Sequence, residues 1–482
     1  MTDKELVEII LNIPVESQTV EFKRLSQVKN EVDRIIESIV ALTNSDGGTV
    51  ILGVGDPSRT TSNPYDRIYG IEENPSNFDL LGRELTRIIP PLGSIWPPQI
   101  IPVPEVNKRI ALILIPKSVD NFHSINNHVY IRQQRSNKLL TAHELIKFAY
   151  AKGFQKADKE LVEVDFGLLK TSYYEEWKDA RKVTGNSIEE VLEKTGLARK
   201  NENGQVKPTR AAVLLFAEYP SDLMDSKCTV RVFQYTGKLE TFGETPNLIG
   251  TPKTISGPII KLIKEAHEYV LTLLRSGIKI PSGFVTKYQV PERAVKEAIT
   301  NAVIHRDYYI KRDIEVKIFE DRVEIENPGL FPYNITSTNI GHIRSDGYRN
   351  DLLVKHLREF PSPPNLDQNE GVRAIRVEMK DGNLYPPIYW TYPHLNDSVR
   401  IILLNEKVAS EWEKINHYLT INKYITNEIA REITGIQQRD SMSKILKKWV
   451  DKGLLIQIKP SSGYLRTTKY RLSDTSEMAP RV

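Results

Sequence analysis

The sequence predicts an α+β protein built from several domains. Its 482 residues exceed a typical domain of about 100 to 150 residues, so roughly two to four domains are expected. Apolar residues recur at helical spacing in 31–42 and 297–308, and alternate with polar residues in 20–23 and 314–325. Because both patterns recur along the chain, we expect a mixture of helices and sheets. We expect four parts, at residues 1–150, 151–275, 276–405 and 406–482.

Composition limits the class of protein. Hydrophobic residues make up 40% and charged residues 27%, as in a soluble globular protein. No apolar run is long enough to cross a bilayer, and the start MTDKELVEII does not resemble a signal peptide, so we expect a cytoplasmic protein without a membrane partner. The single cysteine excludes an internal disulfide and a Cys-based zinc site. Since the net charge is only +4, any case for nucleic acid depends on local clusters.

The first 60 residues predict a helix, a strand, a second helix and a second strand. The first helix ends before Ile13 and Pro14, and Val20 alternates with Phe22 in a strand. The helix at 31–42 is followed by a turn, NSDGG, and by the buried strand TVILGVGD. Side chains gather where strands end, so this order of elements predicts a polar cluster at one edge of the sheet.

That cluster contains Glu16, Glu21, Asp56 and Lys23. Three carboxylates are able to hold one or two divalent metals that activate water, and a lysine is able to stabilise charge on a phosphate. We therefore expect a metal-dependent nuclease centre there. The alternative is that these acidic residues are solvated or pair with lysines.

The N-terminal segment resembles a known family. ESQTVEFK, then ALTNSDGG and GVGD, is similar to the Schlafen-type AlbA-like domain, and HVYIRQQRSNKLLTAHEL is similar to its closing strand and turn. The resemblance extends to about residue 150. It implies that Glu16, Glu21 and Asp56 hold Mg²⁺ or Mn²⁺ in an endoribonuclease site with Lys23. Basic residues of the closing strand are expected to contact RNA phosphates, namely Arg132, Arg135 and Lys138.

A second polar stripe lies on the predicted helix EAITNAVIHRDY. Residues four apart share a helix face, so Glu297, Asn301 and His305 line up opposite an apolar side. Glu297 suits a general base, and the Asn301 carbonyl suits a magnesium ligand. The alternative is an amphipathic helix whose polar side faces water.

This helix resembles the ATP-binding helix of the GHKL superfamily, and most closely the variant in RecG-related, Schlafen-like ATP-binding proteins. PTRAAVLLF, at 208–216, is similar to a segment that precedes the ATP-binding region in that family. The resemblance implies an α/β sandwich that binds ATP and Mg²⁺. It assigns ligand contacts to the HRDY residues, to the NPG loop after the hairpin at 314–325, to the lid at 330–350 and to a glycine beyond it. These are Asn301, His305, Arg306, Asp307, Asn327, Gly329, Arg349, Asn350 and Gly371.

Two departures from that family concern the nucleotide. Asn327 stands where an aspartate commonly accepts the adenine amino hydrogen, and an amide is a weaker acceptor than a carboxylate. Gly371, in NEGV, stands where the family usually has two glycines. We therefore expect nucleotide binding, with weak hydrolysis.

Residues 408–473 predict three helices and a basic hairpin, which resembles a winged helix. The third helix, 439–449, would enter a major groove of DNA, and the hairpin would lie on phosphates. The alternative is a winged helix used for dimerisation or internal packing. The expected DNA contacts are Lys444, Lys447, Lys448, Lys459, Arg466 and Lys469.

The resemblances together imply a protein in which ATP controls a nucleic-acid-engaging domain. We expect RNA at the N-terminal domain, DNA at the winged helix, a homodimer or higher oligomer, and a role in antiviral defence. One alternative is a non-catalytic, ATP-responsive transcriptional regulator, and another is an ATPase in DNA handling. A helicase motor is disfavoured because no G-x-x-x-x-G-K-[ST] loop is present.

Overall fold

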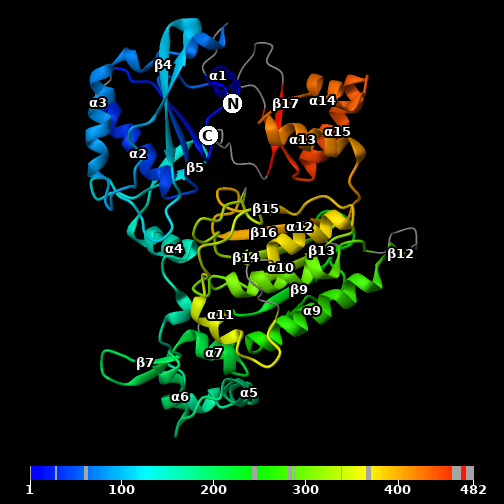
Figure 1. Cartoon of the computed structure of the whole chain (residues 1–482). Helices are drawn as coiled ribbons and strands as arrows, with labels where there is room; N and C mark the ends of the chain where they lie inside the picture. Colours follow the sequence, from blue (N-terminus) through cyan, green and yellow to red (C-terminus); the bar gives the residue numbers. More distant parts are fainter. Residues whose placement is uncertain are drawn as a thin grey trace. The chain divides into compact units, whose positions relative to one another are not determined.

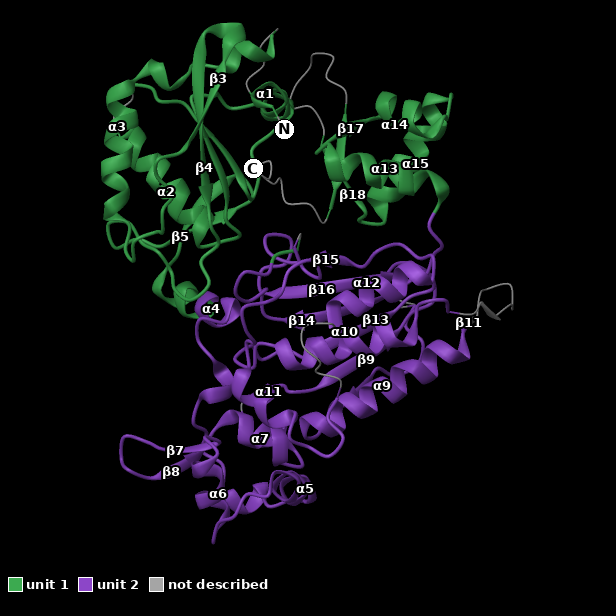
Figure 2. Ribbon diagram, in the orientation of Figure 1, with its two compact units in different colours: residues 1–147, 336–338, 409–482 green, residues 148–335, 339–408 purple. Residues whose placement is uncertain are grey.

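The computed structural model describes residues 2–27, 30–58, 63–224, 226–241, 247–279, 285–286, 288–337, 339–364, 371–458 and 468–473. The chain divides into two compact units (Figure 2). Unit 1 comprises residues 1–147, 336–338 and 409–482, and unit 2 comprises residues 148–335 and 339–408. Among the described residues, no helix combines the length and apolarity needed to cross a membrane.

The N-terminal part of unit 1 is a four-stranded sheet in the order β1-β2-β4-β3 (Figure 1). β1 and β2 are parallel, and the other pairs are antiparallel. The bounds are β1 Val20–Lys23, β2 Gly48–Leu52, β3 Gln99–Val103 and β4 Lys108–Ile115. This confirms the strands predicted from alternation.

Both faces of this sheet are buried because its strands alternate between two apolar clusters. Val50 of β2 packs in one cluster with residues of α2 (Glu31–Thr43) and α3 (Pro75–Glu84). Its neighbour Ile51 packs in the other with residues of α1 (Asp3–Asn12). A capping box at Thr2 fixes the start of α1.

Two further elements complete this part of the chain. A hairpin of β5 (Tyr130–Gln133) and β6 (Ser136–Leu139) follows β4. It leads into α4 (Ala142–Lys152), which begins in unit 1 and ends in unit 2. The helix α3 begins at Pro75 because Asn74 caps it and Pro75 occupies its first turn.

The C-terminal part of unit 1 contains three helices and a small sheet. The helices are α13 (Ser410–Ile421), α14 (Asn427–Thr434) and α15 (Arg439–Asp451). The sheet has the order β17-β19-β18, with β17 Ile425–Thr426, β18 Leu455–Ile458 and β19 Lys469–Leu472. Trp412 packs edge-on against Trp449 in its core. The three helices predicted from the sequence are therefore present.

Unit 2 is built on a six-stranded sheet in the order β10-β9-β13-β14-β16-β15 (Figure 1). The strands are β9 Val230–Gln234, β10 Lys253–Ile255, β13 Ile314–Ile318, β14 Arg322–Pro328, β15 Ile388–Trp390 and β16 Ser398–Leu404. The hairpin predicted at 314–325 is β13 and β14. β9 and β10 precede residue 275, whereas the other four strands of the sheet follow it. The domain boundary expected at residue 275 therefore lies between strands of a single sheet.

Helices pack on the apolar face of this sheet. They are α9 (Ile259–Ser276), α10 (Glu292–His305) and α12 (Gly371–Asp381). Val316 and Ile325 of the sheet share one core with Ala294 and Ile299 of α10. The remaining elements of unit 2 are α5 Ser172–Arg181, α6 Ile188–Lys194, α7 Arg210–Phe216, α8 Pro220–Leu223, α11 Asp351–Leu357, β7 Ala198–Lys200, β8 Val206–Pro208, β11 Ile278–Lys279 and β12 Val285–Thr286.

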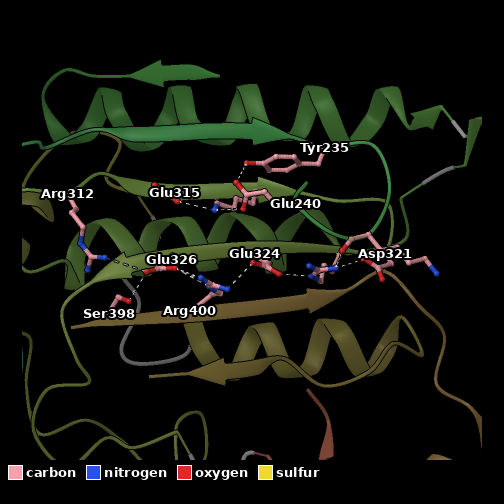
Figure 3. A network of polar contacts seen from close by, with 12 residues as sticks. Tyr235, Glu240, Arg312, Glu315, Asp321, Glu324, Glu326, Ser398 and Arg400 are labelled. Atoms are coloured by element: carbon pink, nitrogen blue, oxygen red, sulfur yellow. Dashed lines mark hydrogen bonds and ion pairs between the residues drawn. The ribbon is translucent and has the colours of Figure 1, made fainter. Parts of the chain in front are cut away.

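The other face of the sheet carries a network of charged side chains (Figure 3). Glu324 lies opposite Lys317 in register, and Glu326 lies opposite Arg400. The Arg400 guanidinium contacts Glu326 Oε2 at 2.6 Å and Glu324 Oε2 at 3.4 Å. Opposite charges across neighbouring strands stabilise this face, and the alternation leaves the inner face apolar.

Candidate functional site

Unit 2 contains an open pocket between α10, the inner face of the sheet and the segment 330–348. Its empty space is about 1170 Å³, including the mouth that opens to solvent. Most of its lining is apolar, including Ile325, Ile340 and Ile401. Polar side chains occupy only a few positions, a composition typical of pockets for small organic ligands.

One polar end of the pocket is formed by Glu297, Asn301 and Gly371. All three line the pocket, and Glu297 is 6% exposed. A Cβ on Gly371 would lie 2.8 Å from Glu297 Oε2 and 3.0 Å from Asn301 Nδ2. Gly371 begins α12, so the backbone of this helix start lies directly against the carboxylate and the carboxamide.

This end of the pocket fits the expected Mg²⁺ and phosphates. A buried carboxylate and a carboxamide oxygen are hard ligands of the kind that Mg²⁺ prefers, and Asn301 Nδ2, a donor that suits a phosphate oxygen, has no hydrogen-bond partner among the described residues. Amide groups at a helix start attract phosphate. The alignment of Glu297 and Asn301 on one face of α10 is confirmed, and this face lines a pocket.

His305 lies one turn further along α10. Its ring stacks on Tyr348 with centroids 5.4 Å apart, and both residues line the pocket. Burial, and then the charge of Arg349, lower the pKa of His305 to about 4. The imidazole is therefore neutral at pH 7, and its buried Nδ1 has no hydrogen-bond partner among the residues described.

Asn327 and Tyr389 bring two further polar atoms to the pocket. Asn327 Oδ1 and the Tyr389 hydroxyl are both buried, neither has a hydrogen-bond partner within the described ranges, and both residues line the pocket. Asn327 lies on β14 opposite Val399, and Tyr389 lies on β15 opposite Ile401. The sequence prediction included Asn327 but missed Tyr389, because a tyrosine in a short alternating strand gives no signal of ligand binding.

Arg349 does not serve as a phosphate contact in this structure. Its guanidinium is 1% exposed and donates to the carbonyls of Tyr150, Ala151 and Leu330. Asp307 Oδ2 lies 3.9 Å from Arg349 Nη1. These backbone carbonyls occupy the donors of the side chain, so a phosphate contact of Arg349 stays a prediction.

Its neighbour Asn350 is also structural. Asn350 Nδ2 donates to the carbonyl of Ile304 at 2.9 Å and to that of Arg306 at 2.8 Å, which joins the end of the lid to the end of α10. Asn350 is fully buried and does not line the pocket.

Three other expected ligand contacts also have structural roles. Arg306 donates to the carbonyl of Ile310 at 2.9 Å, and Asp307 Oδ1 accepts from the amide of Tyr309 at 2.9 Å. Gly329 has φ +111°, and a Cβ there would lie 2.9 Å from Asp307 Cβ, so its close approach is to protein and not to a ligand. None of the three lines the pocket.

In the N-terminal domain the charges of Glu21 and Asp56 both act on the Glu16 carboxyl. Glu16 Oε1 accepts from the amide of Phe22 at 3.0 Å. Burial, followed by the charges of Glu21 and Asp56, raises the pKa of Glu16 to about 7. The three carboxylates are thus close enough to repel one another.

They do not form the expected metal site in this structure. Glu21 is 3% exposed and pairs with the Arg132 guanidinium and with Lys23 Nζ, the latter at 2.7 Å. Within the described ranges, no group of three or more His, Cys, Asp or Glu side chains is arranged to hold a metal ion. Arg132 and Lys23 therefore already neutralise the carboxylate of Glu21.

Arg132 was expected on the nucleic-acid surface, but it is 1% exposed and bound inside the domain. Besides Glu21, it donates to the carbonyl of Ser17 at 3.0 Å and to Asn137 Oδ1 at 3.0 Å. Arg135 and Lys138 are exposed, as expected, although Lys138 pairs with Glu144 at 2.7 Å.

The basic residues of α15 lie on its outer side. Lys444, Lys447 and Lys448 are exposed, whereas Leu446 and Trp449 are buried. Lys469 is half-buried on β19. Lys459 and Arg466 lie outside the described residues, so the basic hairpin stays a prediction.

Comparisons with known proteins identify two parts of the chain. Residues 16–141 match the family model "Schlafen, AlbA_2", and residues 311–403 match "Putative ATP-dependent DNA helicase recG C-terminal". No curated protein matches. A solved structure that matches is the DIP2311 protein from Corynebacterium diphtheriae. The two chains are 16% identical, the match covers 97% of this chain and 84% of that chain, and the TM-score is 0.37. The chain is a Schlafen-like, RecG-related protein, with an AlbA_2 domain and a domain of the ATPase-like RecG C-terminal type.

Proposed function

We propose that this protein binds ATP with Mg²⁺ in the pocket of unit 2 and that occupancy of this pocket controls nucleic-acid binding by the AlbA_2 domain. The observation that carries the proposal is the pocket itself, which has a carboxylate, a carboxamide and a helix start at one end and an apolar chamber at the other. Phosphates and Mg²⁺ suit the first end, and a purine base suits the second.

The residues of this chain have distinct tasks in that site. Glu297 and Asn301 would hold the magnesium, which supplies charge neutralisation of the phosphates. Gly371 lets the start of α12 approach closely because any Cβ would clash with both side chains. Glu297 is also placed to accept a proton from water, which is the basis for weak ATP hydrolysis.

A route for control follows from the contacts of α4. The last residues of this helix belong to unit 2, where the Ala151 carbonyl accepts from the Leu330 amide at 2.9 Å and from Arg349. Leu330 lines the pocket, and Arg349 follows pocket-lining Tyr348 directly. A ligand that moves these residues would therefore act on α4, the helix that directly follows the residues matched as AlbA_2.

The test measures nucleic-acid affinity with and without nucleotide. Purified full-length protein is titrated with labelled RNA and duplex DNA, alone, with Mg²⁺, and with Mg²⁺ plus ATP. We expect ATP to change the affinity of wild type several-fold and to leave Asn301→Ala unchanged. Equal affinities for wild type in all conditions would contradict control, whatever the affinity for ATP.

A second candidate function is metal-dependent cleavage of RNA by the AlbA_2 domain, for example of tRNA. The gathering of Glu16, Glu21 and Asp56 favours it, while the pairing of Glu21 with Arg132 and Lys23 opposes it. Glu21 is a poor position for a test because its loss would leave buried Arg132 unpaired. Asp56→Ala is the better variant, with Mn²⁺ added; cleavage by wild type that this variant lacks would support the nuclease.

Further parts of the proposal concern assembly and context. We place DNA on α15, whose exposed lysines suit phosphates in a winged-helix arrangement, and RNA on the AlbA_2 domain. Nucleotide-dependent closure of the lid would favour a homodimer, and a role in antiviral defence would suit a nucleotide-controlled nuclease. A non-catalytic regulator of transcription is the outcome if duplex DNA is bound and no RNA is cut.

A further inference from the structure

The Tyr389 hydroxyl is an unsatisfied polar group on the wall of the pocket. Tyr389 is 5% exposed, and its hydroxyl has no hydrogen-bond partner among the described residues. Burying a hydroxyl without a partner costs about 1–3 kcal/mol, and native structures keep few such groups. A phenylalanine would fill the same space without that cost.

The surroundings of Tyr389 direct attention to the ligand. Its ring packs edge-on against Phe331, with centroids 6.1 Å apart, and it lies opposite Ile401 on β16. Phe331 and Ile401 both line the pocket. The second unsatisfied atom of this end, Asn327 Oδ1, is on β14, which pairs with the other side of β16.

We propose that Tyr389 is a specificity-determining residue, whose hydroxyl and the Asn327 carboxamide together bind the hydrogen-bonding edge of the nucleotide base. This inference rests on the proposed nucleotide site and adds a base contact from the outermost strand, β15. It accounts for the two buried polar atoms that the protein leaves unpaired at the apolar end of the pocket.

The chemistry of the two groups favours adenine. Asn327 Oδ1 is an acceptor, and a tyrosine hydroxyl is able to donate. Adenine presents an amino donor beside a ring-nitrogen acceptor, which complements this pair. Guanine presents a carbonyl acceptor beside an N–H donor, so it would meet an acceptor at Asn327 Oδ1 unless the carboxamide turns its Nδ2 to the base and the tyrosine hydroxyl accepts. A site that hydrogen-bonds its ligand discriminates strongly against one that leaves its buried groups unpaired.

The test compares two tyrosines whose buried hydroxyls both lack a hydrogen-bond partner among the described residues. The Tyr288 hydroxyl is also buried and has no hydrogen-bond partner in the described part of the chain, but Tyr288 does not line the pocket. Calorimetry with Mg²⁺ and ATP on full-length protein should show about three- to tenfold weaker binding for Tyr389→Phe and no change for Tyr288→Phe. Without nucleotide, both variants should melt at or above the wild-type temperature, because each loses an unpaired buried hydroxyl.

A base analogue then locates the contact. ATP that lacks the ring nitrogen beside the amino group (1-deaza-ATP) should bind wild type as weakly as ATP binds Tyr389→Phe, and the variant should lose nothing further. Equal ATP affinity for Tyr389→Phe and wild type would overturn the proposal while leaving the nucleotide site intact. A wild-type protein that binds no nucleotide would instead overturn the proposed function on which it rests.

Discussion

The guanidinium of Arg349 donates to the carbonyl of Ala151 at 2.5 Å, across 198 residues of sequence. The same group donates to the carbonyls of Tyr150 and Leu330. The buried guanidinium of Arg349 therefore joins the end of α4 to Leu330, at the start of the lid, while Arg349 itself lies at the end of the lid. Its planar fork of donors suits three acceptors in a way that a lysine cannot reproduce.

Replacing Arg349 should destabilise unit 2. We expect Arg349→Lys to lower the free energy of unfolding by about 2–4 kcal/mol, because buried carbonyls lose their donors. Urea unfolding followed by circular dichroism measures this change. Arg344→Lys is the control, since Arg344 is exposed on the same segment and should have no effect. Equal losses in both variants would show that Arg349 has no special structural role.

Gly371→Ala should weaken nucleotide binding without unfolding the protein. The added Cβ would lie 2.8 Å from Glu297 Oε2 and 3.0 Å from Asn301 Nδ2, so it displaces the groups assigned to magnesium. We expect at least about a tenfold loss of affinity for Mg²⁺ and ATP, about 1.4 kcal/mol, by calorimetry. Gly93→Ala, where no atom lies within 4 Å, should bind as wild type. Unchanged binding by Gly371→Ala would show that the phosphates do not bind at the start of α12.

The stability of the AlbA_2 domain should depend on pH through Glu16. Its pKa is raised from 4.5 in the unfolded chain to about 7 in the folded one, first by burial and then by Glu21. A raised pKa means that the folded state holds the proton more tightly. Glu16 therefore contributes stability below pH 4.5, and this contribution is lost as the pH rises through 7.

Glu16→Gln should remove that dependence. The amide oxygen keeps an acceptor for the amide of Phe22 and carries no charge. We expect the variant to be more stable than wild type at pH 8, by up to about 3 kcal/mol, and nearly equal to it at pH 4.5. Thermal melts across this range measure the difference. A difference that grows toward low pH would contradict the assigned shift.

Lysines on α15 should set the salt dependence of DNA binding. Each lysine that neutralises a phosphate adds about 0.9 to the slope of log affinity against log salt. The double variant Lys444→Gln, Lys447→Gln should therefore lower this slope by about 2. Lys414→Gln, exposed on α13, is the control. An unchanged slope in the double variant would favour the alternative use of this part of the chain in packing or dimerisation.

The sequence predicted the elements better than the roles of single polar residues. Periodicity was sufficient for α2, α10 and the β13–β14 hairpin because each element has one strongly apolar face. It also placed Glu297 beside Asn301, since spacing alone fixes which residues share a helix face.

Three residues predicted as ligand or nucleic-acid contacts are buried for one physical reason. Arg132, Arg349 and Asn350 belong to motifs rich in polar residues, and the motif does not show that each side chain is satisfied by backbone or carboxylate groups distant in sequence. Tyr389 was missed for the converse reason. Tyr389 stands out because its buried hydroxyl has no hydrogen-bond partner among the described residues, and the sequence alone does not show which groups surround a side chain.

The most direct test of this account is calorimetric titration of full-length protein with ATP in excess Mg²⁺, beside Asn301→Ala. We predict a saturable heat for wild type, a strong loss of binding in the variant, and the same melting temperature for both proteins without nucleotide, because Asn301 Nδ2 has no hydrogen-bond partner to lose among the residues that the structure describes. Folded wild-type protein that gives no heat with ATP, or an Asn301→Ala variant that binds as tightly, would contradict the account.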